Sequence, residues 1–189
     1  MTEFPFLHLI VAGVIGFVSV VVGYMSAGVR NLLVFPFNVV TFSILITCTT
    51  MSRLLLPLCP QPRLAIPDAA AWGVGLTLFG TGALIIILAV WQIGLPAAAS
   101  APNRQRRLVT NGIYRRLRHP IYLGEILWPI GWAILFKALW ALAVTPVWIA
   151  LLLTIALLEE KRLSEEYAEK HEEYKKHVPF LLPGVFKSW

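Results

Sequence analysis

The sequence predicts an all-α protein, a polytopic transmembrane helical bundle with about five spans, from two observations. Of the 189 residues, 58% are hydrophobic and 14% are charged, and the mean hydropathy is +0.73. One soluble core cannot bury this much apolar surface. In addition, four apolar runs approach the roughly 20 residues that cross a hydrocarbon core. They cover residues 6–27, 33–56, 69–91 and 140–158.

A fifth, shorter apolar run covers residues 121–136 and fits a tilted or partly buried helix. Little more than Lys137 and Ala138 separates it from the next run. We therefore expect a tight antiparallel hairpin of the last two spans. Short links between the runs predict a single domain over residues 1–189, with the first three spans in residues 1–95. Residues 96–189 would hold a basic loop, the hairpin and a tail helix.

The distribution of charge predicts how the chain is oriented in the membrane. The first run follows Glu3 and precedes Arg30, so we interpret it as a retained span and not a cleaved leader. Positive charge is concentrated before the fourth span and in the tail, and the positive-inside tendency puts both in the cytoplasm. Five spans then put the amino terminus outside, although Arg53 and Arg63 weigh against this. The cations before the fourth span are Arg104, Arg106, Arg107, Arg115, Arg116 and Arg118.

The net charge of +6 does not require a nucleic-acid partner. Arginine and lysine beside anionic membrane lipids produce the same excess of base. Cys48 lies in an apolar run and Cys59 in a proline-rich loop, and neither has a second cysteine or histidine at metal-ligand spacing. The sequence therefore predicts neither a metal site nor a disulfide.

The third run carries four glycines in two pairs that are seven residues apart, Gly73 with Gly80 and Gly75 with Gly82. Each pair falls on one helix face, where small residues let neighbouring backbones approach closely. We expect these glycines to serve helix packing, with contact to a cofactor as the alternative.

Beyond Leu158 the chain becomes abruptly polar, without proline or glycine until Pro179. Leu163, Tyr167, His171 and Tyr174 recur at helical spacing. The fifth span is therefore predicted to continue into water as one uninterrupted helix, which forms a cytoplasmic carboxyl-terminal segment.

His119-Pro120 marks the start of the fourth span. Proline favours the first helical position and its predecessor is disfavoured within a helix, which predicts His119 as the cap. The exposed amides and positive dipole of the helix start would suit an anion such as an amino-acid carboxylate, with Arg118 reinforcing them. The alternative is that Arg115, Arg116 and Arg118 only anchor the helix to lipid phosphates.

Two adjacent carboxylates, Glu159 and Glu160, follow the last apolar turn of the fifth span. They are unfavourable at this end of a helix dipole. No cation lies three or four residues before Glu159, and none lies four residues after it. An ammonium group or ribose hydroxyls of a cofactor would supply a partner. Because a tight hairpin returns to one membrane level, His119 and Glu159 should be neighbours. Tyr114, Tyr122 and Trp128 could add aromatic faces for a sulfonium or an adenine, or belong to an interfacial belt.

Four motifs carry a family resemblance. They are Leu-Val-Thr-Asn-Gly-Ile-Tyr (108–114), Arg-His-Pro-Ile-Tyr-Leu-Gly (118–124), Glu-Glu (159–160) and Tyr-Lys-Lys-His-Val-Pro (174–179). In order and spacing they resemble the isoprenylcysteine carboxyl methyltransferase family and, more distantly, the phospholipid methyltransferases. The resemblance covers roughly the carboxyl-terminal half of the chain.

The resemblance implies an integral membrane methyltransferase that holds S-adenosyl-L-methionine between the basic loop, the base of the hairpin and the tail helix. His119 and Glu159 would position the reactants. The other contacts follow from matching positions of this sequence to the motifs of the family. To these we add Arg118 and Glu160, which the charge pattern described above singles out. The expected cofactor contacts are Arg106, Arg107, Leu108, Val109, Tyr114, Arg118, His119, Pro120, Ile121, Tyr122, Glu159 and Glu160.

The sequence departs from the family at one position. Eukaryotic members carry an arginine one turn before the glutamates for the prenylcysteine carboxylate, and Ile155 stands there. We therefore expect a lipophilic acceptor from the bilayer without identifying it, and the absence of an evident base favours O-methylation. The alternatives are a phospholipid N-methyltransferase, an NADPH-dependent enzyme similar to sterol reductases, and a non-catalytic lipid-binding membrane protein. The oligomeric state stays open.

Overall fold

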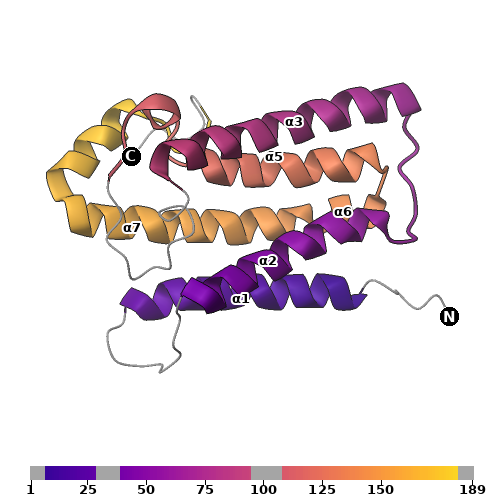
Figure 1. Cartoon of the computed structure of the whole chain (residues 1–189), viewed down its shortest axis with the longest axis horizontal. Coiled ribbons are helices and arrows are strands. Elements are labelled where there is room, and N and C mark those ends of the chain that lie inside the picture. The colour runs from indigo at the N-terminus through magenta and orange to yellow at the C-terminus, as the bar shows by residue number, and fades with distance from the viewer. Residues whose placement is uncertain (1–6, 29–38, 95–107, 183–189) are drawn as a thin grey trace.

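The computed structural model describes residues 7–28, 39–94 and 108–182 (Figure 1). Within these ranges the chain is helical and forms no strand, which confirms the all-α prediction; Arg63 and Ala138 form an isolated bridge. The helices are α1 (Leu7–Gly28), α2 (Val39–Leu55), η1 (Leu56–Leu58), α3 (Asp68–Ile93), η2 (Gly112–Arg115), α5 (Pro120–Leu135), α6 (Leu139–Ala143) and α7 (Thr145–His177).

Two helical stretches are long and apolar enough to cross a membrane. One is α3, which matches the predicted third run. The other is the stretch Leu139–His177, which contains α6 and α7, whereas α5 is a shorter apolar helix. The number of spans and the sides of the termini stay predictions.

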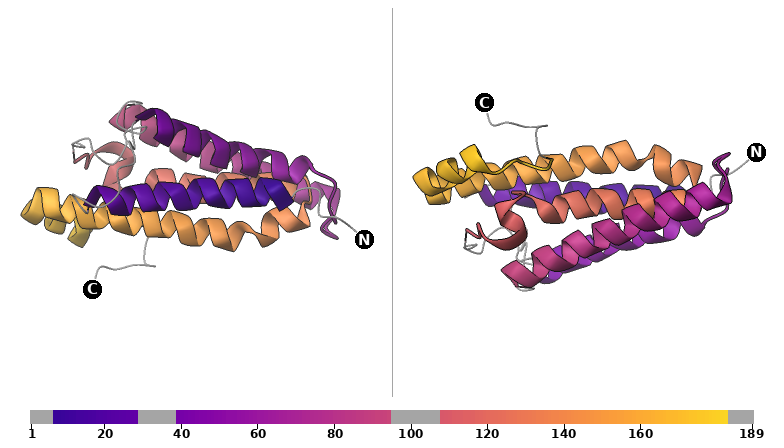
Figure 2. Two further views of the ribbon diagram at one scale, coloured as in Figure 1. Left: turned by 90° about the horizontal axis from the view of Figure 1, so that it is seen from below. Right: turned by 90° about the horizontal axis from the view of Figure 1, so that it is seen from above.

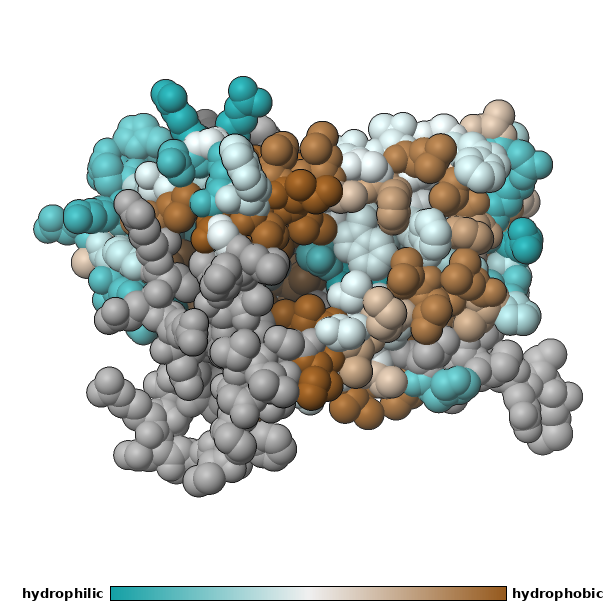
Figure 3. Space-filling model, in the orientation of Figure 1, coloured by the Kyte–Doolittle hydropathy of each residue, from teal (hydrophilic) through white to brown (hydrophobic). Residues whose placement is uncertain are grey.

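α3 exposes a largely apolar surface. Trp72 is 58% exposed and Trp91 is 80% exposed, at opposite ends of the helix. At 1.5 Å per residue they are about 28 Å apart along the axis, close to the roughly 30 Å thickness of a hydrocarbon core. Hydrophilic residues gather at the end of the molecule that contains the tail of α7, and hydrophobic residues lie along the middle of the same face (Figure 3).

Glycines bring α3 and α5 into close backbone contact. The two helices run antiparallel (Figure 1), with Gly75 of α3 against Gly131 of α5, and Gly82 against Gly124. A Cβ added at Gly82 would lie 2.6 Å from the backbone nitrogen of Trp128, which is too close for any side chain. The other predicted pair, Gly73 and Gly80, has nothing within 4 Å of such a Cβ. Close packing therefore involves one of the two predicted faces.

A tight turn joins α5 to the last helices. Lys137 has φ 53°, in the left-handed region, and its carbonyl accepts a 2.8 Å hydrogen bond from the Leu64 amide. The Gln61 side chain accepts hydrogen bonds from the amides of Trp140 and Ala141 at 2.9 and 3.2 Å. The short α6 follows, and α7 then returns antiparallel to α5 (Figures 1 and 2). Both the start of α5 and the polar part of α7 therefore lie at one end of the molecule.

The prediction of one uninterrupted last helix is wrong. Ala168 has φ 40° and ψ −116°, so α7 is two helices joined at a kink. Beyond the kink the chain turns back toward the segment that precedes α5 (Figure 1). Ser164 consequently lies within 3.3 Å of both Glu172 and Lys175, residues that a straight helix would carry far away. The periodicity of apolar residues cannot predict that one residue has non-helical φ and ψ angles. Alanine is also a strong helix former, so its identity does not predict a kink.

A buried ion pair links α2 to α5. Arg53, which is 6% exposed, lies 2.6 Å from Oε2 of Glu125 through Nη2. The Trp128 indole N–H donates to the same oxygen at 3.3 Å, and the Arg53 guanidinium lies 5.2 Å from the Trp128 ring centre. The charge that weighed against the predicted topology is thus neutralised inside the bundle. Trp128 therefore contacts both members of this pair.

Candidate functional site

His119 occupies the cap position of α5, and Pro120 lies in the first turn, as the sequence predicts. The imidazole nevertheless makes no capping hydrogen bond to the helix. Its Nε2 lies 2.9 Å from Oε1 of Glu160 on α7. Because the carboxylate accepts, the Nε2 carries the proton and donates. Because the His119 side chain does not cap α5, the amide end of this helix is suited to an anion, as expected of a helix start.

Glu160 is the centre of a buried charged cluster. Its Oε2 pairs with Nη1 of Arg118, and its Oε1 faces both His119 and, at 3.8 Å, Nε2 of His171. Burial raises the pKa of Glu160, but the hydrogen bond from His119 and the charge of Arg118 outweigh it and hold that pKa below its usual range. Glu160 is therefore ionised at neutral pH. We call these four residues the Glu160 junction.

Glu159 has a partner within the chain. The hydroxyl of Tyr122 donates to its Oε2 at 2.8 Å, so the residue does not depend on a cofactor for a hydrogen bond. Tyr122 also lies edge-on to His119, with ring centres 5.5 Å apart. Tyr122 therefore links His119 to Glu159, which the sequence predicts to be neighbours. His119 itself contacts Glu160 directly.

The segment after α7 crosses the start of α5. The amides of Arg118 and His119 donate to the carbonyls of Pro179 and Phe180 at 3.0 and 3.2 Å. The Phe180 ring lies 4.6 Å from the His119 ring and 5.6 Å from the Arg118 guanidinium. Phe180 was not predicted as a site residue. The Val-Pro motif just before Phe180 ends the tail helix beside the site, and this motif could have indicated its position.

The segment before α5 is held by both α3 and the tail of α7. The amide of Ile113 donates to the Gln92 side chain at the end of α3, at 2.8 Å, and the Tyr174 hydroxyl donates to the Tyr114 carbonyl. Burial raises the pKa of Tyr174, so this hydroxyl keeps its proton. Gly112 has φ 58°, and a Cβ there would lie 1.4 Å from the Gln92 amide. The Asn-Gly-Ile-Tyr motif therefore serves the placement of this segment.

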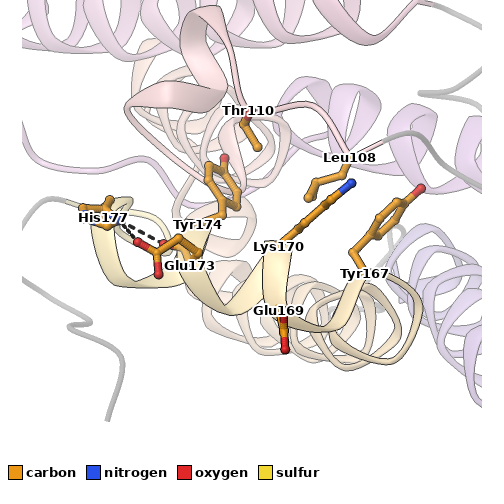
Figure 4. A pocket seen from close by; sticks show the side chains of 8 residues that line it. All are labelled: Leu108, Thr110, Tyr167, Glu169, Lys170, Glu173, Tyr174 and His177. Atoms are coloured by element: carbon orange, nitrogen blue, oxygen red, sulfur yellow. Dashed lines mark hydrogen bonds and ion pairs between the residues drawn. The ribbon is translucent and has the colours of Figure 1, made fainter.

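An open pocket of about 730 Å³ lies between this segment and the tail of α7 (Figure 4). Tyr174 and Lys170 extend toward Leu108 and Thr110, whereas Glu169 points away (Figure 4). Leu108 was predicted to contact a cofactor. The other lining residues were not, although those on α7 recur at helical spacing and could have been recognised as one face. The lining residues are Leu108, Thr110, Tyr167, Glu169, Lys170, Glu173, Tyr174 and His177.

The remaining predicted residues are distributed around this region. Arg106 and Arg107 lie outside the described residues. Val109 and Ile121 are partly exposed, and Pro120 is fully buried. Ile155, at the position of the family arginine, is buried in a cluster with Trp148 and Leu152, against which Tyr122 packs. The environment of Ile155 is thus apolar.

Comparison with known proteins places the chain in a family. The family model described as phospholipid methyltransferase matches residues 71–170, more than half of the 189 residues. This segment begins in α3, includes the start of α5 and ends just after the kink in α7. No solved structure matches the chain.

Individual relatives align over the same region. The chain is 32% identical over 92 residues to a protein-S-isoprenylcysteine O-methyltransferase of Schizosaccharomyces pombe, covering 46% of this chain and 37% of that protein. It is 33% identical over 79 residues to a methanethiol S-methyltransferase of Crocosphaera subtropica, covering 42% and 30%. It is 29% identical over 111 residues to a steroid 5-alpha-reductase of Solanum lycopersicum, covering 58% and 42%.

The chain therefore spans less than half of the length of each of these three relatives. Two of the three are named as methyltransferases, as is the family model. The resemblance seen in the sequence motifs is confirmed, and the chain belongs to the phospholipid methyltransferase family.

Proposed function

We propose that this protein is an integral membrane methyltransferase that uses S-adenosyl-L-methionine and methylates a lipophilic acceptor. One observation carries the proposal. The family-matched segment brings the start of α5 and the polar part of α7 together as the Glu160 junction, and a pocket lies beside the same tail segment. The charged and polar side chains of the junction and the pocket lie together at one end of an apolar bundle. Such a site suits a soluble, charged cofactor that must meet an acceptor held in the membrane.

The residues present fit the chemistry of such a cofactor. Arg118, His119 and the open start of α5 suit its amino-acid carboxylate. Leu108, Tyr167 and Tyr174 offer apolar and aromatic surface for the adenosine. The pocket volume lies within the range of roughly 300–1,000 Å³ that is typical of small-molecule sites. Arg106, Arg107, Val109, Pro120, Ile121, Tyr122, Glu159 and Glu160 complete the proposed set.

The protein's own groups would act by orientation. S-adenosyl-L-methionine, when bound, supplies a methyl group on a cationic sulfur. Tyr122 fixes the Glu159 carboxylate by its hydrogen bond, and Glu160 fixes His119 and Arg118. Groups held in this way align reactants and exclude water, which can supply much of the rate enhancement of a displacement. The arrangement offers no evident base, which favours an acceptor that is already ionised.

The acceptor would approach from the apolar side. Trp148, Leu152 and Ile155 form a buried apolar cluster directly against Tyr122. The two relatives named as methyltransferases act, by their names, on isoprenylcysteine and on methanethiol. We propose an acceptor whose reacting atom has nonpolar surroundings.

We also propose a topology of five spans. The active site and the carboxyl terminus would lie in the cytoplasm and the amino terminus outside. The widely spaced Trp72 and Trp91 support α3 as one of these spans.

Transfer of a labelled methyl group tests the proposal. The full chain, purified in detergent, would be incubated with labelled S-adenosyl-L-methionine and a lipid extract of the host membranes. Label in the organic phase is expected with the wild type and lost with Glu160→Gln. Glu165→Gln, an exposed residue of the same helix, is the matched control and should retain transfer. No labelled lipid with the wild type would favour the non-catalytic alternative.

One observation favours a second function. The alignment with the steroid 5-alpha-reductase covers more of this chain than that with either methyltransferase, 58% against 46% and 42%. A nicotinamide cofactor also carries phosphates that would suit Arg118 and the basic loop. The two functions differ in the cofactor that the pocket binds, so a binding comparison separates them.

A further inference from the structure

His171 is the least expected residue near the Glu160 junction. It lies just beyond the kink in α7 and is 0% exposed. Neither ring nitrogen has a hydrogen-bond partner in the part of the chain that the structure describes. Its Nε2 lies 3.8 Å from Oε1 of Glu160, which is within ion-pair range but too long for a hydrogen bond. A buried imidazole without hydrogen bonds is less stable than a leucine or phenylalanine would be there, so packing alone does not explain it.

Arg118 carries a second unsatisfied group at the same carboxylate. Its Nη1 donates to Glu160, but its Nε is buried and has no partner among the described residues. Buried N–H groups without partners are rare in native proteins, and each calls for a ligand or another explanation. Two of them therefore border Glu160, one from the segment before α5 and one from the tail.

We infer that His171 is a positioning residue of the proposed methyl-donor site: it holds the Glu160 carboxylate from the tail side, so that Arg118 can direct its remaining N–H toward an anionic ligand. The inference rests on the proposed function, since that ligand is the amino-acid carboxylate of S-adenosyl-L-methionine. His171 acts through Glu160 and does not itself touch the reacting atoms.

The geometry explains how the tail could take part. Glu160 uses Oε2 for Arg118 and Oε1 for His119, and His171 approaches that same Oε1. A small inward movement of the segment beyond Ala168 would turn the 3.8 Å separation into a hydrogen bond. The carboxylate would then be shared among three donors and rely less on Arg118. The Tyr174 hydroxyl on the Tyr114 carbonyl already ties the same segment to the loop before α5.

The charge state of His171 follows from its surroundings. Burial lowers its pKa, Glu160 and Glu172 raise it, and Lys175 and Arg118 lower it further, with a net downward shift from 6.5. His171 is therefore neutral at pH 7 and carries one N–H that is available for donation. Protonation in acid would strengthen its hold on Oε1 of Glu160 and so leave Arg118 freer for the anionic ligand. Affinity for the methyl donor should therefore rise as the pH drops below the ordinary histidine range.

The test uses the full chain in detergent with two substitutions at position 171 and one matched control. His171→Phe fills the space without a polar group, and His171→Gln restores a donor. His8→Gln, the matched control, changes an exposed histidine of α1 that does not line the pocket. The dissociation constant of S-adenosyl-L-methionine would be measured by calorimetry across pH 5.5 to 8, together with kcat and the thermal midpoint.

We expect His171→Phe to weaken binding about tenfold, the equivalent of one hydrogen bond, with kcat at saturation within about twofold. It should also lose the acid-side rise in affinity. His171→Gln should recover most of the affinity and also lack the acid limb. His8→Gln should behave as the wild type. Wild-type affinity and pH profile in His171→Phe would overturn the role of His171 alone. Absence of binding by the wild type would overturn the proposed function and this role with it.

Discussion

His119 and Glu160 meet at the polar end of the bundle, with Nε2 of the imidazole 2.9 Å from Oε1 of the carboxylate. His119 immediately precedes α5 and Glu160 follows the apolar part of α7, so this hydrogen bond joins two helices that run in opposite directions. Arg118 and His171 complete the contact. The turn after α5 lets α7 run back beside it and so places Glu160 next to His119. The proposed site therefore depends on this turn.

Replacing Glu160 should affect both binding and stability. Glu160→Gln removes the charge that neutralises Arg118, whose side chain is 5% exposed. A buried charge left without its partner typically costs about 3–5 kcal/mol. We expect a lower thermal midpoint and lost binding of S-adenosyl-L-methionine, measured on the same detergent sample. An unchanged midpoint in Glu160→Gln, equal to that of Glu165→Gln, would contradict the arrangement described for Arg118.

The Tyr122 hydroxyl should matter through Glu159. Tyr122→Phe removes the 2.8 Å hydrogen bond and little else. If orientation of Glu159 serves the methyl transfer, kcat/KM should fall about tenfold, the equivalent of one hydrogen bond. The double variant Tyr122→Phe/Glu159→Gln should lose little more than Glu159→Gln alone, because both changes break one interaction. Fully additive losses would show that the two residues act independently.

The glycines of α3 allow a matched comparison of packing. Gly82→Ala places a Cβ 2.6 Å from the backbone of α5, whereas Gly80→Ala meets nothing within 4 Å. Forcing two helices apart typically costs about 1–3 kcal/mol. We expect Gly82→Ala to have a clearly lower thermal midpoint than the wild type. Gly80→Ala should keep the wild-type midpoint. Equal effects of the two would mean that the contact between α3 and α5 is not the one described.

The ion pair between α2 and α5 predicts a rescue experiment. Arg53→Met leaves the partly buried Glu125 beside Trp128 without its cation, which should cost up to about 3–5 kcal/mol. Adding Glu125→Gln removes the stranded charge and should recover most of the thermal midpoint. If the double variant is as unstable as Arg53→Met alone, the pair contributes by packing and not by charge.

Stability should depend on pH through His171. Its pKa in the folded protein lies below 6.5, so the unfolded chain binds the proton first as the pH falls. The free energy of unfolding should therefore fall below about pH 6.5 and be unaffected by this residue above it. His171→Phe should flatten the thermal midpoint between about pH 5 and 6.5. The carboxylate of Glu160, whose pKa is lowered from 4.5, contributes below this window and does not interfere. A midpoint that falls equally in both proteins would exclude His171 as the cause.

Much of the fold follows from local sequence features. Apolar runs predict α3 and the last helix, and Pro120 predicts the start of α5, because run length and the missing proline amide act locally. The kink at Ala168 has no such local signal, since alanine favours a helix, and it accompanies a contact of the tail with the loop before α5. Similarly, the two glycine pairs of α3 are equivalent by spacing, and only the position of α5 distinguishes them.

The site was predictable to the level of neighbouring elements. Spacing and charge single out His119 and the two glutamates, but not which glutamate His119 would contact. Glu159 and Glu160 differ by about 100° around the helix, so the choice depends on the rotation of α7 against α5. His171 shows the same limit. It fits the apolar stripe of the tail by spacing, and only the fold places its side chain beside Glu160.

Equilibrium binding of two cofactors to the full chain in detergent tests the central claim most directly. The account predicts that S-adenosyl-L-methionine binds saturably to the wild type, that Glu160→Gln loses this binding while Glu165→Gln keeps it, and that NADPH does not compete. Tight binding of NADPH, with no binding of S-adenosyl-L-methionine, would contradict the account and assign the Glu160 junction to a reductase.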